Sequence, residues 1–332
     1  MQPAVGIGRA QLGQPDEGLV VDDDLREGHE AGPSRELGST VRVLCQIDFA
    51  EGDPALLEQR LGQVAQAAGI GGVDGDVPHE SSEYRKTTDV PGPLKAEAVV
   101  LRSIRYGEAD RVLHLYTADH GRLGAIAKGV RRARSRFGGR LEPFFRLQIM
   151  LHQGRGDLHT VTGAETVAAH PRLRDHAAAL DAAARACDAV ARLFGDGDPH
   201  PAVYALLCNE LALLDSRPDR AGRANQLAFR LKLLVASGLA PVLAHCASCG
   251  ERDHLSGFSG AAGGVVCSAC EASAFALDEE AHGFLVDALG RPLAQAPDAS
   301  ERALRQAERA IGETAEHHAH VHLRAAGPFG HR

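Results

Sequence analysis

The chain has 332 residues, of which 44% are hydrophobic, 24% charged and 4% aromatic. This composition is ordinary for a globular protein and excludes collagens, coiled coils and small disulfide scaffolds, while the length allows two or three domains. The net charge of −8 argues against a nucleic-acid partner only if the charge is spread evenly. The sequence has no apolar run of about 18 residues and does not begin like a signal peptide, so we expect neither a membrane span nor secretion.

The charge is divided unevenly along the chain. Residues 1–92 carry 7 basic and 17 acidic side chains, whereas residues 95–150 carry 12 basic and 5 acidic ones. An Asp triplet and several Gly and Pro clusters break the first segment, and only 41–49 and 54–68 suggest a strand and a helix there. We expect residues 1–92 to be an acidic, disordered extension or sequence upstream of the true start, with a small added domain as the alternative.

Five short strands are predicted after this extension. Alternating apolar residues and glycine punctuation indicate strands over Glu97–Ile104, Asp110–Thr117, Arg122–Lys128, Phe144–His152 and Leu158–Gly163. Five strands in about 75 residues are typical of a small closed or partly open barrel.

The apolar period becomes helical from His170 onward. It predicts helices over Asp175–Phe194, Ala202–Leu214, Arg223–Ser237, Asp278–Leu289 and Ser300–Leu323. A glycine-rich segment with cysteines interrupts these helices. The predicted organisation is therefore a multidomain α+β protein. It has a β-barrel at 93–168, an α-helical domain in two parts at 169–243 and 273–325, and a cysteine-bearing insertion at 244–272.

Four cysteines form the most specific motif of the sequence. Cys246, Cys249, Cys267 and Cys270 make two C-x2-C pairs, and this spacing is typical of a closed, tetrahedral, structural Zn²⁺ site. Zinc would fold a segment that lacks a core of its own. A rubredoxin-like iron site, a redox pair and four metal-free thiols are the alternatives. Reduced cysteines around a metal favour the cytoplasm as the location.

Positive charge is concentrated in the predicted loop 128–140, which contains no acidic residue. Its basic residues are Lys128, Arg131, Arg132, Arg134, Arg136 and Arg140. Such a cluster releases counterions when it meets phosphates, so the loop is a candidate DNA-binding strip, with a solvated basic loop as the alternative. Tyr106, Tyr116 and Phe137 are candidates for base stacking. Their alternative is the barrel core, which we favour for Tyr116.

Enzyme motifs are absent or incomplete. The sequence contains no P-loop, no G-x-S-x-G and no H-E-x-x-H, and no pair of carboxylates marks a general acid and base. His318 and His322 share a face of the last predicted helix and suggest a metal site, but a helix that simply ends in histidines explains them as well. A zinc enzyme is disfavoured because four thiolates leave no open coordination position. We therefore expect a protein that is not an enzyme.

Several motifs, in order between residues 95 and 325, resemble the RecO recombination-mediator family. They are YGEAD at 106–110, HGR at 120–122, KGVR at 128–131, LEPF at 141–144, FRLKLL at 229–234, GLAP at 238–241 and the first cysteine pair. The resemblance implies an N-terminal OB-fold, a helical domain and a zinc-binding insertion. Residues 1–92 have no counterpart in the family.

The resemblance also implies a function. It implies a DNA repair and recombination mediator that binds single- and double-stranded DNA and anneals complementary strands coated by single-strand-binding protein. It further implies help to RecR in loading RecA, without nucleotide hydrolysis. Lys128, Arg131 and Arg132 match basic positions of the family motif, whereas Arg134, Arg136 and Arg140 are assigned by charge alone.

The expected partners are therefore DNA, RecR, single-strand-binding protein and, indirectly, RecA, with no membrane and a location in the bacterial cytoplasm at the nucleoid. The helix with Arg230 and Lys232 is a candidate docking surface for the acidic tail of single-strand-binding protein, with packing as an equal alternative. A different class of protein also fits the sequence. It is a zinc-ribbon adaptor whose basic loop contacts an acidic protein instead of DNA.

Overall fold

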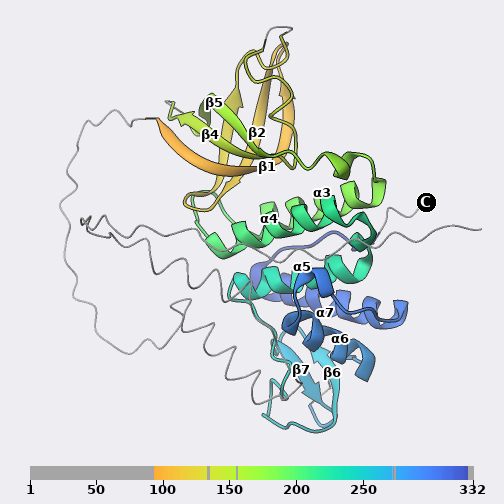
Figure 1. The fold of residues 1–332 in the computed structure, drawn as a ribbon. Coiled ribbons are helices and arrows are strands. Elements are labelled where there is room, and N and C mark those ends of the chain that lie inside the picture. The colour runs from red at the N-terminus through yellow and green to blue at the C-terminus, as the bar shows by residue number, and fades with distance from the viewer. Residues whose placement is uncertain (1–92, 133–134, 155, 271, 273, 328–332) are drawn as a thin grey trace, which may run out of the picture.

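The computed structural model describes residues 93–327, except 133–134, 155, 271 and 273. The predicted extension 1–92, with the strand and helix expected in it, lies outside the described residues. Within the described part, a β-barrel packs on stacked layers of helices, and a small sheet lies at the end far from the barrel (Figure 1). No helix of this part is long and apolar enough to cross a membrane.

The barrel contains five strands. They are β1 (Leu94–Tyr106), β2 (Asp110–Thr117), β3 (Gly121–Ala127), β4 (Arg146–His152) and β5 (His159–Ala168). The sheet closes in the order β1-β2-β3-β5-β4, with antiparallel neighbours except for the short parallel pair of β3 and β5. This is the OB-fold, and it confirms the predicted fold class.

Strand β1 is long enough to belong to two faces of the barrel. A bulge between Val100 and Arg102 shifts its pairing with β2, and a bulge bends the strand that contains it. The N-terminal half of β1 pairs with β4, while its C-terminal half pairs with β2 alone. The curved path of β1 around the barrel is visible in Figure 1.

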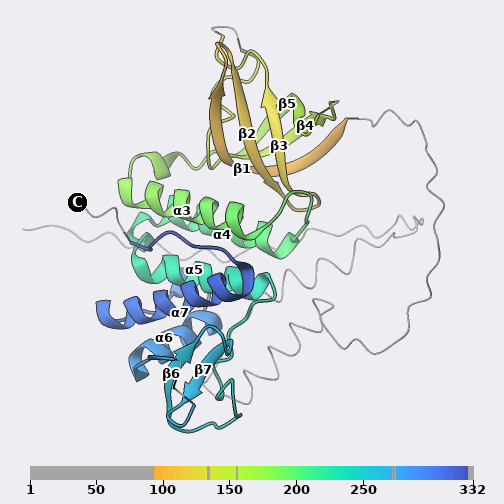
Figure 2. The same ribbon diagram turned by 180° about the vertical axis from the view of Figure 1, so that it is seen from behind.

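The helical region contains five α-helices. They are α3 (Ala177–Leu193), α4 (Pro201–Ser216), α5 (Arg223–Ala236), α6 (Glu279–Gly290) and α7 (Glu301–Ala319), with short 3₁₀ turns η2 (Pro171–Arg174), η3 (Pro218–Arg220) and η5 (Leu293–Gln295). Helices α3 and α4 lie against the barrel, α5 and α7 form the next layer, and α6 lies beside the small sheet (Figure 2). That sheet contains β6 (Leu255–Ser259), β7 (Gly264–Cys267) and β8 (Phe275–Ala276) in the order β7-β6-β8.

Tyr116 joins the barrel to the helices. It is fully buried, and its ring meets that of Phe194 edge-on at a centroid distance of 6.0 Å. Arg122 of β3 donates from Nε to Asp196 Oδ1 at 2.6 Å and also binds the carbonyl oxygen of Ala191 at the end of α3. Tyr116 is thus buried, as the favoured alternative expected, but in the core that the barrel shares with the helices and not in the barrel core itself.

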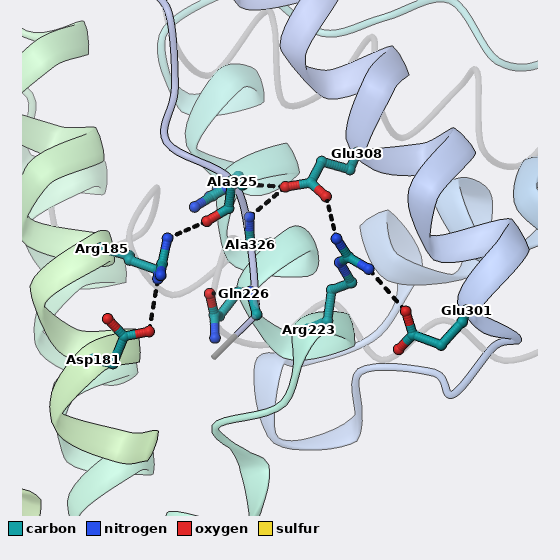
Figure 3. A network of polar contacts seen from close by, with 10 residues as sticks. Asp181, Arg185, Arg223, Gln226, Glu301, Glu308, Ala325 and Ala326 are labelled. Carbon is teal, nitrogen blue, oxygen red and sulfur yellow. Dashed lines mark hydrogen bonds and ion pairs between the residues drawn. The ribbon is translucent and has the colours of Figure 1, made fainter. Parts of the chain in front are cut away.

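The last described residues form a strap over α3, α5 and α7 (Figure 3). Arg185 donates to the carbonyl oxygen of Ala325, and the backbone N–H of Ala326 donates to Glu308. Gly327 N donates to Gln226 Oε1 at 3.1 Å. Three helices are thus tied to the chain end through side chains that bind its backbone.

Element ends differ from the predictions where the backbone turns left-handed. Phe144 has φ 73°, so β4 begins at Arg146, and His320 has φ 54°, so α7 ends at Ala319 rather than Leu323. Strand β5 runs on to Ala168, past the Gly163 predicted as its end, because it keeps pairing with β4.

Candidate nucleic-acid interface and metal centre

The basic loop 128–140 begins tied to the hairpin between β1 and β2. Gly129, at φ +67°, donates its N–H to Asp110 Oδ1 at 2.7 Å, and Arg131 N donates to Ala109 O at 2.9 Å. A glycine adopts this left-handed conformation without the strain that a side chain brings. The loop therefore leaves β3 at a fixed angle, and Arg131 lies beside the hairpin tip.

The second half of the loop closes one end of the barrel. Phe137 and Leu141 are each 2% exposed and belong to the barrel core. The guanidinium of Arg136 lies 4.7 Å from the centroid of the Phe137 ring and donates to Val161 O at 3.4 Å. Phe137 is thus not available to stack on bases, and of its two interpretations the barrel core is confirmed. Burial of this apolar ring removes its surface from water, which stabilises the folded protein.

The described cations of the loop are exposed. They are Lys128, Arg131, Arg132, Arg136 and Arg140, whereas Arg134 lies outside the described residues. None of these five has a carboxylate partner in the described part of the chain. The arginines of the helical region differ, since many bind carboxylates, for example Arg192 with Asp188 and Arg291 with Asp287. The unpaired positive charge lies on the barrel, where phosphates would replace water as its partner.

Sequence reasoning missed three further exposed cations, which lie on β1. Arg102 and Arg105 are exposed on the C-terminal half of β1, and Tyr106, at the hairpin tip, is 59% exposed. Lys95 is exposed at the start of the same strand. The excess of basic residues over 95–150 carried this signal, but only the fold shows which of them lack partners. Of the three aromatic candidates, Tyr106 alone remains open for stacking.

The candidate docking surface on α5 does not exist as an exposed surface. Arg230 is 4% exposed and lies 3.6 Å from Glu308, and burial lowers its pKa to about 10. Lys232 donates to Leu289 O at 3.0 Å, and burial lowers its pKa to about 8. Both side chains serve packing within the helical layers, which was the equal alternative.

The four cysteine sulfurs of the motif meet at one point. The Sγ atoms of Cys246, Cys249, Cys267 and Cys270 lie within 4.8 Å of one another, and those of Cys249 and Cys267 are 3.7 Å apart. Four sulfurs at about 2.3 Å from a tetrahedral zinc ion stand about 3.8 Å apart. A disulfide needs about 2.05 Å. The spacing therefore fits thiolates around a metal ion.

The thiols of the cluster differ in pKa. Burial opposes ionisation of Cys246, but hydrogen bonds from the backbone of Cys267, Cys249 and Ser248 outweigh it and lower the pKa of this thiol to about 6. The thiols of Cys249 and Cys267 raise the pKa of Cys270 to about 12. Metal ligands must be deprotonated, so binding of an ion to this cluster would release protons and depend on pH.

Glycine turns and one backbone hydrogen bond bring the two cysteine pairs together. Gly250, at φ +80°, donates to Cys246 O at 2.8 Å and closes the first pair. Gly264 leaves room for Val242, whose carbonyl oxygen would lie 2.2 Å from a Cβ added there. The N–H of Ala247 donates to Val265 O at 2.8 Å, which fixes the first pair on β7.

The histidines near the end of α7 do not gather into a metal site. Among the described residues, the four cysteines are the group of three or more ligands whose donor atoms come together. His318 Nε2 lies 2.9 Å from Gly260 O, and His322 lies beyond the end of the helix. The shared helix face that the sequence suggested is therefore lost.

The barrel, its unpaired cations and the four-thiol cluster define a class: an OB-fold protein with a surface suited to polyanions and a centre suited to a metal ion. Sequence models described as the N and C termini of recombination protein O match residues 93–170 and 175–325. The chain belongs to the RecO family, as the sequence motifs indicated.

Curated relatives agree with this assignment, and each is called DNA repair protein RecO. The protein from Rubrobacter xylanophilus is 41% identical over 223 residues, which cover 65% of this chain and 88% of the relative. The protein from Myxococcus xanthus is 38% identical over 178 residues, or 52% of this chain and 71% of the relative. The protein from Bifidobacterium adolescentis is 42% identical over 182 residues, or 52% and 72%.

Proposed function

We propose that this chain is a DNA repair and recombination mediator that binds single- and double-stranded DNA through the basic loop and the adjoining hairpin tip. Five exposed loop cations that have no carboxylate partner among residues 93–327 as described are the observation that carries the proposal. Membership of a family whose relatives are called DNA repair proteins supports it. Lys128, Arg131, Arg132, Arg134, Arg136 and Arg140 are the proposed DNA-binding residues.

The proposed activity is to anneal complementary strands coated by single-strand-binding protein and to assist RecR in loading RecA. Two strands repel each other, and a cationic surface that binds backbones without reading bases lowers this repulsion. No bond is made or broken in this activity, so no catalytic residue is assigned. The proposed place of action is the bacterial cytoplasm, at the nucleoid.

The four cysteines are proposed to hold one structural Zn²⁺. All-sulfur coordination by two C-x2-C pairs suits zinc, and four thiolates leave no free coordination position for a substrate. The ion would supply the charge that the thiolates need and would join the turn at 246–249 to the end of β7. The proposed DNA-binding residues lie on the barrel, so zinc serves the fold of the insertion rather than the contact with DNA.

Salt-dependent binding tests the proposal. Full-length protein is titrated into a fluorescein-labelled single strand at several salt concentrations, with three unrelated base sequences. We expect an affinity that falls steeply with salt and changes little with sequence, and we expect the protein to speed the annealing of coated complementary strands. Absence of binding at low salt would favour the zinc-ribbon adaptor, whose basic loop contacts an acidic protein.

A further inference from the structure

Unpaired cations lie on two separate faces of the barrel. Arg105 is near the hairpin tip, where the basic loop also begins. Lys95 is at the other end of β1. The path along β1 from Lys95 to Tyr106 is at most about 36 Å long, since a bulge bends the strand. Between them, Val99 and Leu101 are buried in the core that the barrel shares with the helices. The two faces are therefore not continuous along β1.

A cavity of about 290 Å³ lies on the second face, where β1, β4 and β5 run side by side. Lys95 pairs with Met150 across β1 and β4, and Met150 pairs with Gly163 across β4 and β5. Paired residues point to the same side of a sheet, so these three form one row on the outer face. Arg136 of the basic loop lines the same cavity.

Met150 forms an apolar floor in this cavity. It is 43% exposed, although a large apolar side chain gains by burial. A Cβ added at Gly163 would lie 3.3 Å from Met150 Sδ, so the missing side chain of Gly163 leaves the room that the thioether occupies. A thioether makes favourable contacts with aromatic rings. The floor suits a flat heteroaromatic ring.

The walls of the cavity carry the groups that a nucleotide needs. Lys95 and Arg136 are exposed cations without a carboxylate partner among the described residues, and stacking on Phe137 holds the Arg136 guanidinium in place. Gln148 and Glu165 face each other across β4 and β5 and line the same cavity. Their amide and carboxylate can pair with the polar edge of a base, while the cations pair with its phosphate.

We propose that this cavity is a second nucleotide-binding subsite of the barrel, which takes one nucleotide of a single strand independently of the hairpin tip. The proposal rests on the DNA-binding function proposed above. Two subsites on opposite sides of one basic loop let the barrel hold two segments of single strand at once. Such an arrangement would favour annealing, since it keeps two strands near each other.

The methionine content of the chain makes the subsite directly observable. The full chain has 2 methionines, Met1 and Met150, so methyl-¹³C methionine labelling of full-length protein gives a Met150 signal that is easily assigned. The probe is a single strand of roughly four nucleotides, the lower end of the site size of one OB-fold. We expect ring currents of a stacked base to shift the Met150 methyl signal in a saturable way.

Variants separate the subsite from general charge effects. Lys95→Ala should weaken the Met150 shift several-fold and reduce the salt slope of binding by about 0.7, the value for one lost phosphate contact on a single strand. Tyr106→Ala should leave the shift unchanged, because the hairpin tip is a separate surface. Arg172→Ala removes one exposed charge from the helical region and serves as the matched control.

Three outcomes would overturn the inference or its basis. A Met150 signal that does not move while the protein binds DNA by anisotropy would refute the subsite and leave the proposed function intact. Loss of the shift in the Tyr106→Ala protein would show one surface instead of two. Absence of any DNA binding at low salt would refute the proposed function itself.

Discussion

Replacing Lys128, Arg131 and Arg132 together by Ala tests the cationic strip most directly. All three side chains are exposed and have no carboxylate partner in the described part of the chain. The bonds that shape the loop, from Gly129 N to Asp110 and from Arg131 N to Ala109 O, use backbone donors and survive the substitutions. The variant should therefore keep its stability within about 0.5 kcal/mol.

The expected loss of affinity follows from counterion release. Each cation that neutralises a phosphate of a single strand contributes about 0.7 to the slope of log K against log salt concentration. Loss of all three should lower the steepness of this slope by about 2. If the two proteins bind equally at 1 M salt, the variant should bind roughly a hundredfold more weakly than the unaltered protein at 0.1 M salt. Fluorescence anisotropy of a labelled single strand over a salt series measures both quantities.

A matched control decides whether position matters or only net charge. Arg291, Arg302 and Arg305 have side chains that are 51%, 75% and 63% exposed, and each lies near a carboxylate. Replacing these three by Ala removes the same charge from the helical region and should leave the slope near that of the unaltered protein. Equal losses in both variants, or an unchanged slope in the loop variant, would refute the assigned surface.

Three further predictions concern stability. Cys246→Ser should remove the bound metal, measured by elemental analysis of purified protein, and lower Tm; metal retained at one ion per chain would contradict the four-thiolate site. Phe137→Ala should cost about 3–5 kcal/mol in urea unfolding, because the ring is 2% exposed in the barrel core, and a cost below about 1 kcal/mol would contradict that burial. Burial raises the pKa of Glu210 from 4.5 to about 8, so the folded protein holds a proton that the unfolded chain releases in this window. The free energy of unfolding therefore falls as pH rises from 4.5 to 8, by at most about 1.4 kcal/mol per pH unit, and Glu210→Gln should flatten this profile in urea titrations.

The sequence predicted the strands, helices and cysteine cluster because each depends on short spacing. Two C-x2-C pairs need only tight turns, and the glycines that allow them are visible beside the motif. The exposure of side chains was harder to predict. Phe137 lies in a basic loop and looks available, yet it fills the end of the barrel, since a closed barrel needs an apolar residue there.

Ion pairs and hydrogen bonds between helices that are distant in the chain also could not be predicted from the sequence. Arg230 and Lys232 suggested a docking surface on their helix, but α7 supplies Glu308 and α6 supplies the carbonyl of Leu289 as partners. Conversely, Lys95, Arg102 and Arg105 are ordinary residues of a strand until the fold shows that no carboxylate of the described residues pairs with them. A charge count locates the basic module, and only the packing shows which charges remain available to a ligand.

The cysteine-bearing insertion separates two helices that pack on each other. Helix α5 ends at Ala236 and α6 begins at Glu279, so their contact closes a long loop of chain. Closing such a loop costs entropy that grows with its length, and cross-links within the loop reduce that cost. A metal that joins Cys246 to Cys270 would shorten the loop before α6 arrives. Metal binding would then speed the completion of the helical region, and apo-protein would refold more slowly even where its final fold is the same.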